Sequence, residues 1–441
     1  MLMNDIVKKV AYKVKEAGGK TYYVGGYVRD KLLGIDNKDI DIEVHGIVPS
    51  KLEEILNSLG NKIEYGNSFA IYSLKGYNID IALPRSEKAI GKGHKDFEIE
   101  IDPFIGEYKA ARRRDFTINS LMQDVISGEI VDSFGGINDL NNKIIRHVDA
   151  KTFVEDPLRV LRAAQFASRF NFSIAKETIE LCKSIDLSFL SKERIEEELK
   201  KALIKGQKPS IFFESLRQMN QLDYWFKEVK ELIDLKQDAI YHPEGDVWIH
   251  TMEVIDRAVT YRNKLNTYPF MLLCLCHDFG KIVTSQEINE RIHAYNHEIE
   301  GLPIVESFIK RITNHKDTIK YLKNMVPLHM LPNRYAYDNS SDKSFNKMFD
   351  KAIDPKGLIY FSVCDAGSDK YLDCLLNKYE AFLELMKKPY VKGEDLINSG
   401  LNPNDNFSKI LNYAHTLRLA GVDKDNALKQ CLAYSRKLKS N

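Results

Sequence analysis

Two aspartates near the start of the chain, Asp39 and Asp41, are separated by one residue and alternate with isoleucines. Side chains alternate across a β-strand, so we expect both carboxylates on one face while Ile40 and Ile42 enter a core. At a rise of about 3.3 Å per residue their backbones lie roughly 7 Å apart, close enough to bind a shared pair of magnesium ions. Two solvated aspartates on an ordinary strand would show the same spacing.

A glycine pair precedes these aspartates. Gly25 and Gly26 follow the strand-like Tyr22-Tyr23-Val24, and Arg29 comes one turn into the next segment, which we expect to be a helix. A backbone without side chains can approach phosphate with its N–H groups, and arginine adds charge-assisted hydrogen bonds. A plain glycine turn is the alternative for the glycines alone. Together with the aspartates, they predict a site for a nucleoside triphosphate and its magnesium.

Two further stretches, at 70–74 and 78–83, have the alternation of strands and lead into a segment at 84–96 rich in Gly, Lys, Arg and His. The composition of that segment predicts a mobile loop. Asp80 lies on the alternating pattern of its strand. It could be a third carboxylate near the metals or a hydrogen-bonded structural aspartate.

An arginine run at 112–114 enters a segment that we expect to be a helix. Arg114 can bind phosphate, and Asp115 and Asn119, one turn apart, can hydrogen-bond a ribose hydroxyl. An arginine run alone would also suit a solvated surface. The Asp–Asn pair behind it favours a nucleotide site.

Asp156, Arg159 and Arg162 follow at steps of three residues, so on the helix predicted after Pro157 they share one face. Aspartate accepts and arginine donates, so the first two side by side present an acceptor next to a donor. Cytosine and adenine offer an amine beside a ring nitrogen acceptor, whereas uracil and guanine reverse that edge. The pair therefore predicts selection of CTP and ATP, with an intrahelical salt bridge as the structural alternative.

The second half of the chain carries a different set of side chains. His250, the adjacent His277 and Asp278, and the distant Asp365 resemble the HD phosphohydrolase pattern, in which imidazole and carboxylate hold a divalent metal that activates water. Magnesium, manganese or nickel would suit this set. A degenerate HD fold with a purely structural role is the alternative.

Three other histidines accompany this set. His293 and His297, spaced as one helical turn, could support a second metal together with His329. Histidines without a metal-binding role would show the same spacing in the sequence.

Composition limits the wider function. The chain has 441 residues, of which 44% are hydrophobic, so it can form several domains with real cores. A net charge of +1 argues against a uniformly basic surface, so an RNA partner would require a localised positive patch. No apolar run is long enough to span a bilayer, and the first twenty residues have helical spacing rather than that of a signal peptide. We expect a soluble cytoplasmic protein without a membrane partner.

Five motifs in the first 200 residues resemble, in order, those of the class II tRNA nucleotidyltransferases, which comprise the CCA-adding enzymes and related bacterial poly(A) polymerases. The motifs are Gly25-Gly26 with Asp39-Ile40-Asp41, Arg113-Arg114-Asp115 with Asn119, Asp132 to Leu140, Glu155 to Arg159, and Glu193 to Leu199. The resemblance implies template-independent addition of C, C and A to the 3′ end of tRNA. It also implies that Asp39 and Asp41 carry magnesium, that Asp156 and Arg159 recognise the base, and that Arg162 supports the phosphates.

The same resemblance implies an α+β fold. A polymerase-β-like head with a mixed sheet, at 1–145, would precede an all-α neck and body at 146–235, an HD domain at 236–390 and a helical tail at 391–441. Some CCA-adding enzymes carry such an HD domain, which acts on phosphomonoesters and 2′,3′-cyclic phosphates.

There are two alternatives to CCA addition, one within this class of enzymes and one outside it. A poly(A) polymerase, or an enzyme that adds only CC or only A, would share the motifs. The segment at 84–96 favours full addition, and the lack of a long basic extension argues against a poly(A) polymerase. An HD phosphohydrolase with a nucleotide-sensing head is the alternative from another class.

Overall fold

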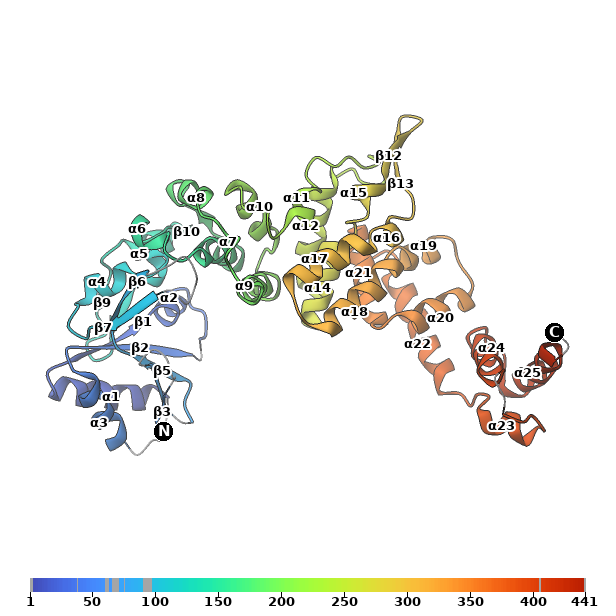
Figure 1. The fold of residues 1–441 in the computed structure, drawn as a ribbon, viewed down its shortest axis with the longest axis horizontal. Helices are drawn as coiled ribbons and strands as arrows, with labels where there is room; N and C mark the ends of the chain where they lie inside the picture. The colour runs from blue at the N-terminus through green and yellow to red at the C-terminus, as the bar shows by residue number, and fades with distance from the viewer. Residues whose placement is uncertain are drawn as a thin grey trace. The chain divides into compact units, whose positions relative to one another are not determined.

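The computed structural model describes residues 3–37, 39–59, 63–65, 71–74, 76–89, 97–403 and 406–439 (Figure 1). The chain forms two compact units, Met1–Trp225 and Phe226–Asn441. The boundaries expected from the sequence, after residues 145, 235 and 390, stay predictions.

A mixed sheet is the centre of the first unit. Within the described residues its strand order is β3-β4-β5-β2-β1-β8-β9, and β2 runs parallel to β5 while the other described pairs are antiparallel. The strands are β1 Lys20–Val24, β2 Ile40–His45, β3 Ile63–Tyr65, β4 Ile71–Leu74, β5 Ile79–Ala82, β8 Met122–Asp124 and β9 Ile130–Val131. The strands predicted around residues 70–74 and 78–83 are confirmed.

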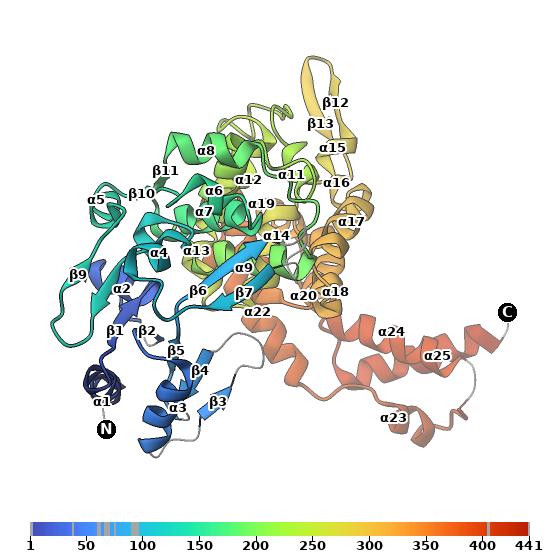
Figure 2. The same ribbon diagram turned by 60° about the vertical axis from the view of Figure 1, so that its left-hand side comes forward.

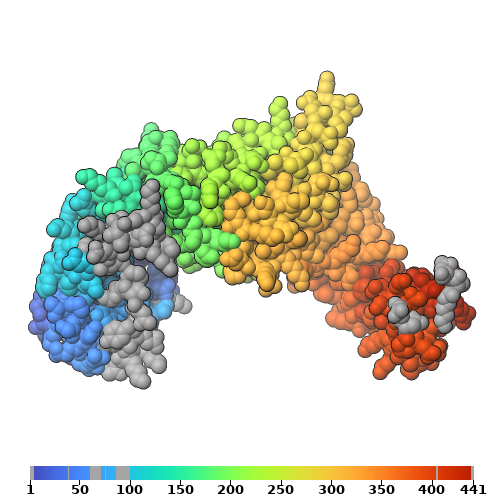
Figure 3. Space-filling model, viewed as in Figure 1, coloured from blue at the N-terminus to red at the C-terminus, as the bar shows by residue number. Residues whose placement is uncertain are grey.

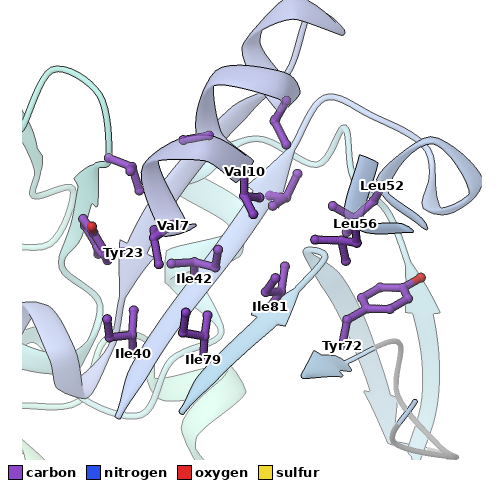
Figure 4. Close-up of a cluster of buried hydrophobic side chains, with 14 of the residues drawn as sticks. Val7, Val10, Tyr23, Ile40, Ile42, Leu52, Leu56, Tyr72, Ile79 and Ile81 are labelled. Atoms are coloured by element: carbon purple, nitrogen blue, oxygen red, sulfur yellow. The ribbon is translucent and has the colours of Figure 1, made fainter. Parts of the chain in front are cut away.

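Two helices, α1 (Met3–Glu16) and α3 (Pro49–Ser58), contribute side chains to the core on one face of this sheet (Figure 4). Apolar residues alternate along β2 and β5 and recur at helical spacing in α1 and α3, so each element buries one face. The labelled core residues from these four elements are Val7, Val10, Ile40, Ile42, Leu52, Leu56, Ile79 and Ile81. Because Ile40 and Ile42 fill this core, Asp41 between them is directed to the other face.

A separate hairpin joins β6 (Arg85–Ala89) to β7 (Phe97–Ile101) outside the main sheet (Figure 2). The prediction of a loop from 84 is therefore wrong for 85–89, while 90–96 lies outside the described residues. Backbone hydrogen bonds pair these strands. Because such bonds do not depend on side-chain type, the composition of this polar, charged segment did not reveal them.

Helices complete the first unit. They are α2 Gly26–Leu32, α4 Glu107–Arg112, the 3₁₀ turn η1 Thr117–Asn119, α5 Gly136–Asn141, α6 Ala150–Phe153, α7 Leu158–Phe170, α8 Lys176–Lys183, α9 Lys192–Lys205 and α10 Ser210–Gln218. The arginine run ends a helix rather than entering one. Asp115 Oδ1 accepts a hydrogen bond from the backbone N–H of Phe116, an extended residue, and this local bond competes with helical pairing.

The second unit is mainly helical. Its helices are α11 Lys227–Lys230, α12 Val247–Arg257, α13 Val259–Arg262, α14 Thr267–Cys276, α15 Lys281–Thr284, α16 His297–Glu300, α17 Leu302–Ile312, α18 Lys316–Met325, the 3₁₀ turn η2 Val326–Leu328, α19 Leu331–Tyr337, α20 Asp342–Lys351, α21 Pro355–Ala366, α22 Leu372–Lys387, α23 Gly393–Asn398, α24 Phe407–Leu419 and α25 Lys424–Lys439. Residues 268–276 of α14 are all buried, as expected for a helix that is apolar on every side. No described helix has the length and apolar character needed to cross a membrane.

Three short strands, β11, β12 and β13, lie in segments expected to be all-α. β10 (Ile144–Ile145) pairs with β11 (Ser173–Ile174), and β12 (Ser285–Ile288) forms a hairpin with β13 (Arg291–Ala294) that projects from the second unit (Figure 3). At the hairpin tip Asn289 and Glu290 adopt φ angles of 51° and 62°. Two consecutive residues with positive φ are typical of a tight two-residue turn that matches the twist of paired strands. Asn289 was the sequence signal for this turn.

Candidate functional site

One cavity in the first unit, of about 760 Å³, gathers every residue predicted to bind the nucleotide. These residues are Gly25, Gly26, Arg29, Asp39, Asp41, Arg114, Asp115, Asn119, Asp156, Arg159 and Arg162. They come from segments up to 137 positions apart in the chain, Gly25 to Arg162. The structure therefore brings the predicted side chains together, and their individual roles stay predictions.

The two aspartates reach the cavity from the start of β2. Asp39 precedes the first strand residue and Asp41 is the second. Asp80 on β5 pairs in register with Asp41 and accepts a hydrogen bond from Ser73 Oγ at 2.8 Å. Burial raises the pKa of Asp41, as do the carboxylates of Asp80 and Asp39, while Arg114 opposes them. A bound cation would relieve this repulsion, so the donor set fits magnesium.

The glycine turn lies beside Arg114. Gly25 has a φ angle of 61°, which favours glycine, and a Cβ at this position would lie 3.3 Å from Arg114 Nη1. A side chain here would therefore be strained and would crowd the arginine. This close approach explains the glycine at position 25 within the predicted phosphate site.

Arg29 has protein partners for several of its donors. Its guanidinium is buried against the rings of Phe166 and Phe170 and donates to Asp30 Oδ1 from Nε at 2.8 Å and from Nη2 at 2.6 Å. Nη1 donates to Asn119 Oδ1 at 2.6 Å. In this arrangement the side chain orients Asn119. Its predicted contact with phosphate would depend on its remaining N–H groups.

Asn119 continues this chain of hydrogen bonds. Its Nδ2 donates to Asp115 Oδ1 at 2.9 Å, and Arg162 donates from Nε to Asp115 Oδ2 at 2.8 Å. Burial would raise the pKa of Asp115, but the neighbouring Arg162 and Asn119 lower it below its ordinary value. The chain from Arg29 to Arg162 therefore fixes both predicted ribose-binding side chains.

Asp156 and Arg159 line the cavity without pairing to each other. Asp156 accepts from Arg194 Nη2, and Arg159 donates to the backbone carbonyls of Thr152 and Arg113, each at 2.9 Å. The alternative considered for this pair, a salt bridge within one helix, is therefore not formed, because both side chains bond to residues of other elements. The acceptor and the donor are held independently.

Glu43 is a residue that the sequence interpretation left without a role. It is buried, Oε1 lies 2.9 Å from His45 Nε2, and Oε2 lies 3.3 Å from Arg114 Nη2. Burial would raise its pKa, yet His45 and Arg114 lower the pKa of Glu43 to about 2. The sequence contained a signal for Glu43, because strand alternation places Asp39, Asp41 and Glu43 on the same face.

Several cationic side chains of the cavity were also missed. Arg85, Arg113, Arg169, Lys201 and Lys205 line it as well. Lys201 and Lys205 lie on α9 at a spacing of four residues, which places them on one helix face. Together with the predicted arginines they give the cavity the positive charge that a triphosphate requires.

A second cluster lies in the second unit, and we call it the His–Asp cluster: His250, His277, Asp278, His297, His329 and Asp365. Two groups of these residues, His250 with His277 and Asp365, and Asp278 with His297 and His329, each have ligand atoms within 4.8 Å of one another. The four residues predicted to hold a metal are therefore together, and His297 and His329 join them.

His293 does not belong with this cluster among the described residues. It lies on β13 and stacks on Tyr295, with ring centroids 5.1 Å apart, while His297 begins α16. The prediction that His293 and His297 lie one helical turn apart is wrong because His293 is in an extended strand that ends at Ala294, and α16 begins only after Asn296, which has a φ angle of 56°.

Glu244 orients one histidine of the cluster. Glu244 Oε1 lies 2.7 Å from His250 Nδ1 and 3.0 Å from His242 Nδ1. A partner on one ring nitrogen fixes the orientation and tautomer of an imidazole, so His250 presents Nε2 inwards.

A cavity of about 430 Å³ opens onto the cluster. Asp278, His297 and Asp365 line it together with Lys281, Tyr241 and Tyr295. Metal donors, a lysine and aromatic rings in one cavity suit a nucleoside phosphate.

Two known families match stretches in the first 233 residues. A family described as "Poly A polymerase head domain" matches residues 21–146, and one described as "Probable RNA and SrmB- binding site of polymerase A" matches residues 171–233. The paired aspartates and Arg114 lie in the part matched by the first, whereas Asp156, Arg159 and Arg162 of the cavity lie between the two matched ranges. The fold and site thus define a nucleotidyltransferase of the poly(A) polymerase head class.

Curated relatives narrow this class. The Multifunctional CCA protein of Mannheimia succiniciproducens is 38% identical over 302 residues, which is 66% of this chain and 70% of that protein. The Haemophilus influenzae protein of the same name is 39% identical over 303 residues, with the same shares covered. The chain belongs to the CCA-adding enzyme family.

Solved structures agree in fold. The Thermotoga maritima CCA-adding enzyme, complexed with tRNA, has a TM-score of 0.65 at 21% identity over 98% of this chain and 95% of that chain. The Bacillus stearothermophilus enzyme, complexed with CTP, has a TM-score of 0.68 at 20% identity over 98% and 97%. The predicted family and the predicted α+β class, a mixed-sheet head followed by helical domains, are confirmed.

Proposed function

We propose that this chain adds C, C and A, one nucleotide at a time, to the 3′ end of tRNA, using CTP and ATP without a nucleic-acid template. The observation that carries this is the single cavity that joins Asp39 and Asp41 to Asp156 and Arg159. Family membership supports the same reaction. The substrates agree with the cytoplasmic location expected from the sequence.

In the proposed reaction the tRNA 3′-hydroxyl attacks the α-phosphorus of the bound triphosphate, its proton is lost, and pyrophosphate leaves. Magnesium held by Asp39 and Asp41 would supply a lowered hydroxyl pKa and neutralise charge on the triphosphate. Arg114, Arg162 and the lysines of α9 would hold the phosphates in position. Positioning and electrostatics account for the rate, and no covalent enzyme intermediate is needed.

Asp156, just before α7, and Arg159, on α7, would select the nucleotide. Asp156 would accept from the amine of cytosine or adenine while Arg159 donates to the adjacent ring nitrogen. Uracil and guanine would place a carbonyl against the carboxylate and an N–H against the guanidinium. One matched bidentate contact contributes ~1–3 kcal/mol to such discrimination.

The test uses tRNA transcripts that end before the first C, after C and after CC, each supplied with one nucleotide at a time. We expect C, C and then A to be added, with arrest after A. An open-ended A ladder would select a poly(A) polymerase, and arrest after CC, or addition of A alone, would select a partial enzyme. No addition would leave a phosphohydrolase with a nucleotide-sensing head.

We further propose that the second unit is an HD-type phosphohydrolase acting on phosphates at RNA ends or on nucleotides. The His–Asp cluster, of which Asp278, His297 and Asp365 line the cavity, supports this second activity. A terminus blocked by a 2′,3′-cyclic phosphate cannot accept a nucleotide, so removal of the phosphate would prepare the end for addition.

Hydrolysis of 2′,3′-cyclic AMP with added nickel or manganese tests this activity. We expect turnover by the parent chain and its loss in the His277→Ala variant. Equal rates for the two proteins would rule out the cluster as the hydrolytic site.

A further inference from the structure

Glu43 lies two residues after Asp41 on β2. Ile42 and Val44, on either side of it, belong to the hydrophobic core, so strand alternation directs Glu43 to the face of the sheet that carries the paired aspartates. The residue is 1% exposed. A buried carboxylate requires partners that compensate its charge, and the partners of Glu43 indicate what it does.

Two consecutive arginines approach the same oxygen of Glu43. Its Oε2 lies 3.3 Å from Arg114 Nη2, in a hydrogen bond, and 3.5 Å from Arg113 Nη2. Two guanidinium groups this close repel each other, and the carboxylate that they share offsets the repulsion. Both arginines line the nucleotide cavity, whereas Glu43 is not one of its lining residues. An effect of Glu43 on a nucleotide would therefore pass through the arginines.

The guanidinium of Arg114 joins Glu43 to the glycine turn. Its Nη2 donates to Glu43, while its Nη1 would lie 3.3 Å from a Cβ placed on Gly25. Because the guanidinium is planar and rigid, holding Nη2 also sets the position of Nη1 beside the turn. That turn is the predicted phosphate site, so the contact with Glu43 orients the arginine towards phosphate.

A histidine occupies the other oxygen of Glu43. Oε1 lies 2.9 Å from His45 Nε2, and the His45 ring packs edge-on against Tyr22, with ring centroids 5.4 Å apart. The Tyr22 hydroxyl donates to Glu107 Oε1 at 2.7 Å. Glu107 begins α4, the helix that ends immediately before Arg113. Both oxygens of Glu43 therefore have fixed partners, and Oε2 is left to the arginines.

We propose that Glu43 is a positioning residue for nucleotide addition, which holds Arg114 and Arg113 at the phosphates of the incoming CTP or ATP. The inference rests on the proposed function of the head. It assigns a role to a residue that would touch neither the substrate nor the magnesium. Because guanidinium groups pair with phosphate oxygens, loss of Glu43 should weaken the binding of the triphosphate and leave the binding of tRNA unchanged.

A double-substitution cycle in the full chain tests whether Glu43 acts through Arg114. Glu43→Gln keeps the size of the side chain and removes its charge. We expect the Kd of CTP, measured by calorimetry, to rise about tenfold in this variant. In the Arg114→Ala background the same substitution should change the Kd less than about twofold, because the group that Glu43 orients is gone.

Steady-state kinetics give a second readout, which a merely structural role would not change. We expect Glu43→Gln to raise the KM for CTP and to leave the KM for tRNA unchanged. Loss of a metal ligand would instead raise the magnesium requirement, so the concentration of magnesium that gives half-maximal addition should stay the same.

The second unit offers a matched control. Glu228 is also a buried glutamate paired with an arginine, Arg311. Glu228→Gln removes a comparable pair and should leave the Kd of CTP unchanged. Circular dichroism verifies that each variant is folded. Glu43→Asp keeps the charge but shortens the side chain, and it replaces Glu43→Gln in the cycle if that variant does not fold. We expect from it a smaller rise in Kd that also disappears in the Arg114→Ala background.

An unchanged Kd for CTP in the Glu43 variant, or a rise that persists in the Arg114→Ala background, would overturn the inference. An unchanged Kd with a raised magnesium requirement would also overturn it and would make Glu43 a metal ligand. If the parent binds CTP but adds no nucleotide to tRNA, the proposed function fails, and the binding cycle still decides the role of Glu43. A parent that does not bind CTP would overturn both.

Discussion

Arg194 on α9 holds the carboxylate of Asp156 at the start of α7. Its Nη2 lies 3.0 Å from Asp156 Oδ1 and 3.1 Å from Oδ2. A carboxylate offers about four acceptor positions, so Asp156 can accept from a base amine while Arg194 fixes its orientation. The acceptor proposed to select cytosine and adenine is therefore set by a residue on another helix.

Removing that support should weaken nucleotide selection. We expect Arg194→Ala to lower the ratio of kcat/KM for CTP over UTP about tenfold, which corresponds to ~1.4 kcal/mol of discrimination. Addition of C should persist, because Asp156 itself remains. Single-nucleotide kinetics on a transcript lacking CCA provide the measurement. Arg112→Ala is the matched control, since Arg112 pairs with Asp149 and is not a lining residue of the cavity. An unchanged ratio in Arg194→Ala would argue against this orienting role.

Asp41 should be required for chemistry but not for RNA binding. Asp41→Asn keeps the shape of the side chain and removes its charge, so magnesium binding should weaken. We expect nucleotide addition to fall by about 10³-fold or more, equivalent to ~4 kcal/mol, with tRNA affinity nearly intact. The rate of nucleotide addition at saturating magnesium tests the first expectation, and a filter-binding assay with tRNA tests the second. Asp36→Asn, an exposed carboxylate on the same cavity, should retain addition. Substantial residual activity in Asp41→Asn would contradict the assignment.

The head illustrates what sequence can predict. Asp39 and Asp41 were found because strand alternation is a fixed period, and the burial of Ile40 and Ile42 sets which face the aspartates take. The same rule would have found Glu43. Arg194 could not be assigned a role in this way, because its contact with Asp156 depends on how α7 and α9 pack.

The second unit shows more clearly what could not be predicted from the sequence. His250, His277, Asp278 and Asp365 were predicted as a set, and His297 and His329 were named for a second metal, but His293 was wrongly grouped with them. The β12–β13 hairpin interrupts the helical spacing assumed for His293 and His297. Two consecutive positive φ angles at Asn289 and Glu290 make this turn, and Asn289 alone was a weak signal.

Asp115 should stabilise the first unit in a pH-dependent way. It accepts hydrogen bonds from Arg162 and Asn119, and such charge-assisted bonds contribute about 1.5–3 kcal/mol. Its pKa is below the ordinary value of 3.8 in the folded chain, so this contribution is present above that pH and is lost as the pH falls through the folded-state pKa. We expect Asp115→Asn to be less stable than the parent at neutral pH, with a difference that shrinks below pH 3.8.

Urea unfolding of the full chain between pH 3 and 7, followed by circular dichroism, measures this difference. Asp36→Asn again serves as the control, because its exposed carboxylate should change the free energy of unfolding little at any pH. A stability difference for Asp115→Asn that is independent of pH would exclude the charge of Asp115 as its source.

Glu244 should set the metal affinity of the His–Asp cluster without binding metal there. Its Oε1 lies 2.7 Å from His250 Nδ1, on the side of the ring away from the proposed ion. Loss of such a partner typically lowers metal affinity 10–100-fold. We expect this weakening in Glu244→Gln, measured by competition with a chelator in the chain carrying Asp39→Asn and Asp41→Asn. Glu253→Gln, on the same helix as His250 but paired with Arg257, should bind metal as the parent does. Equal affinities for Glu244→Gln and Glu253→Gln would show that the orientation of His250 is fixed by the surrounding packing instead.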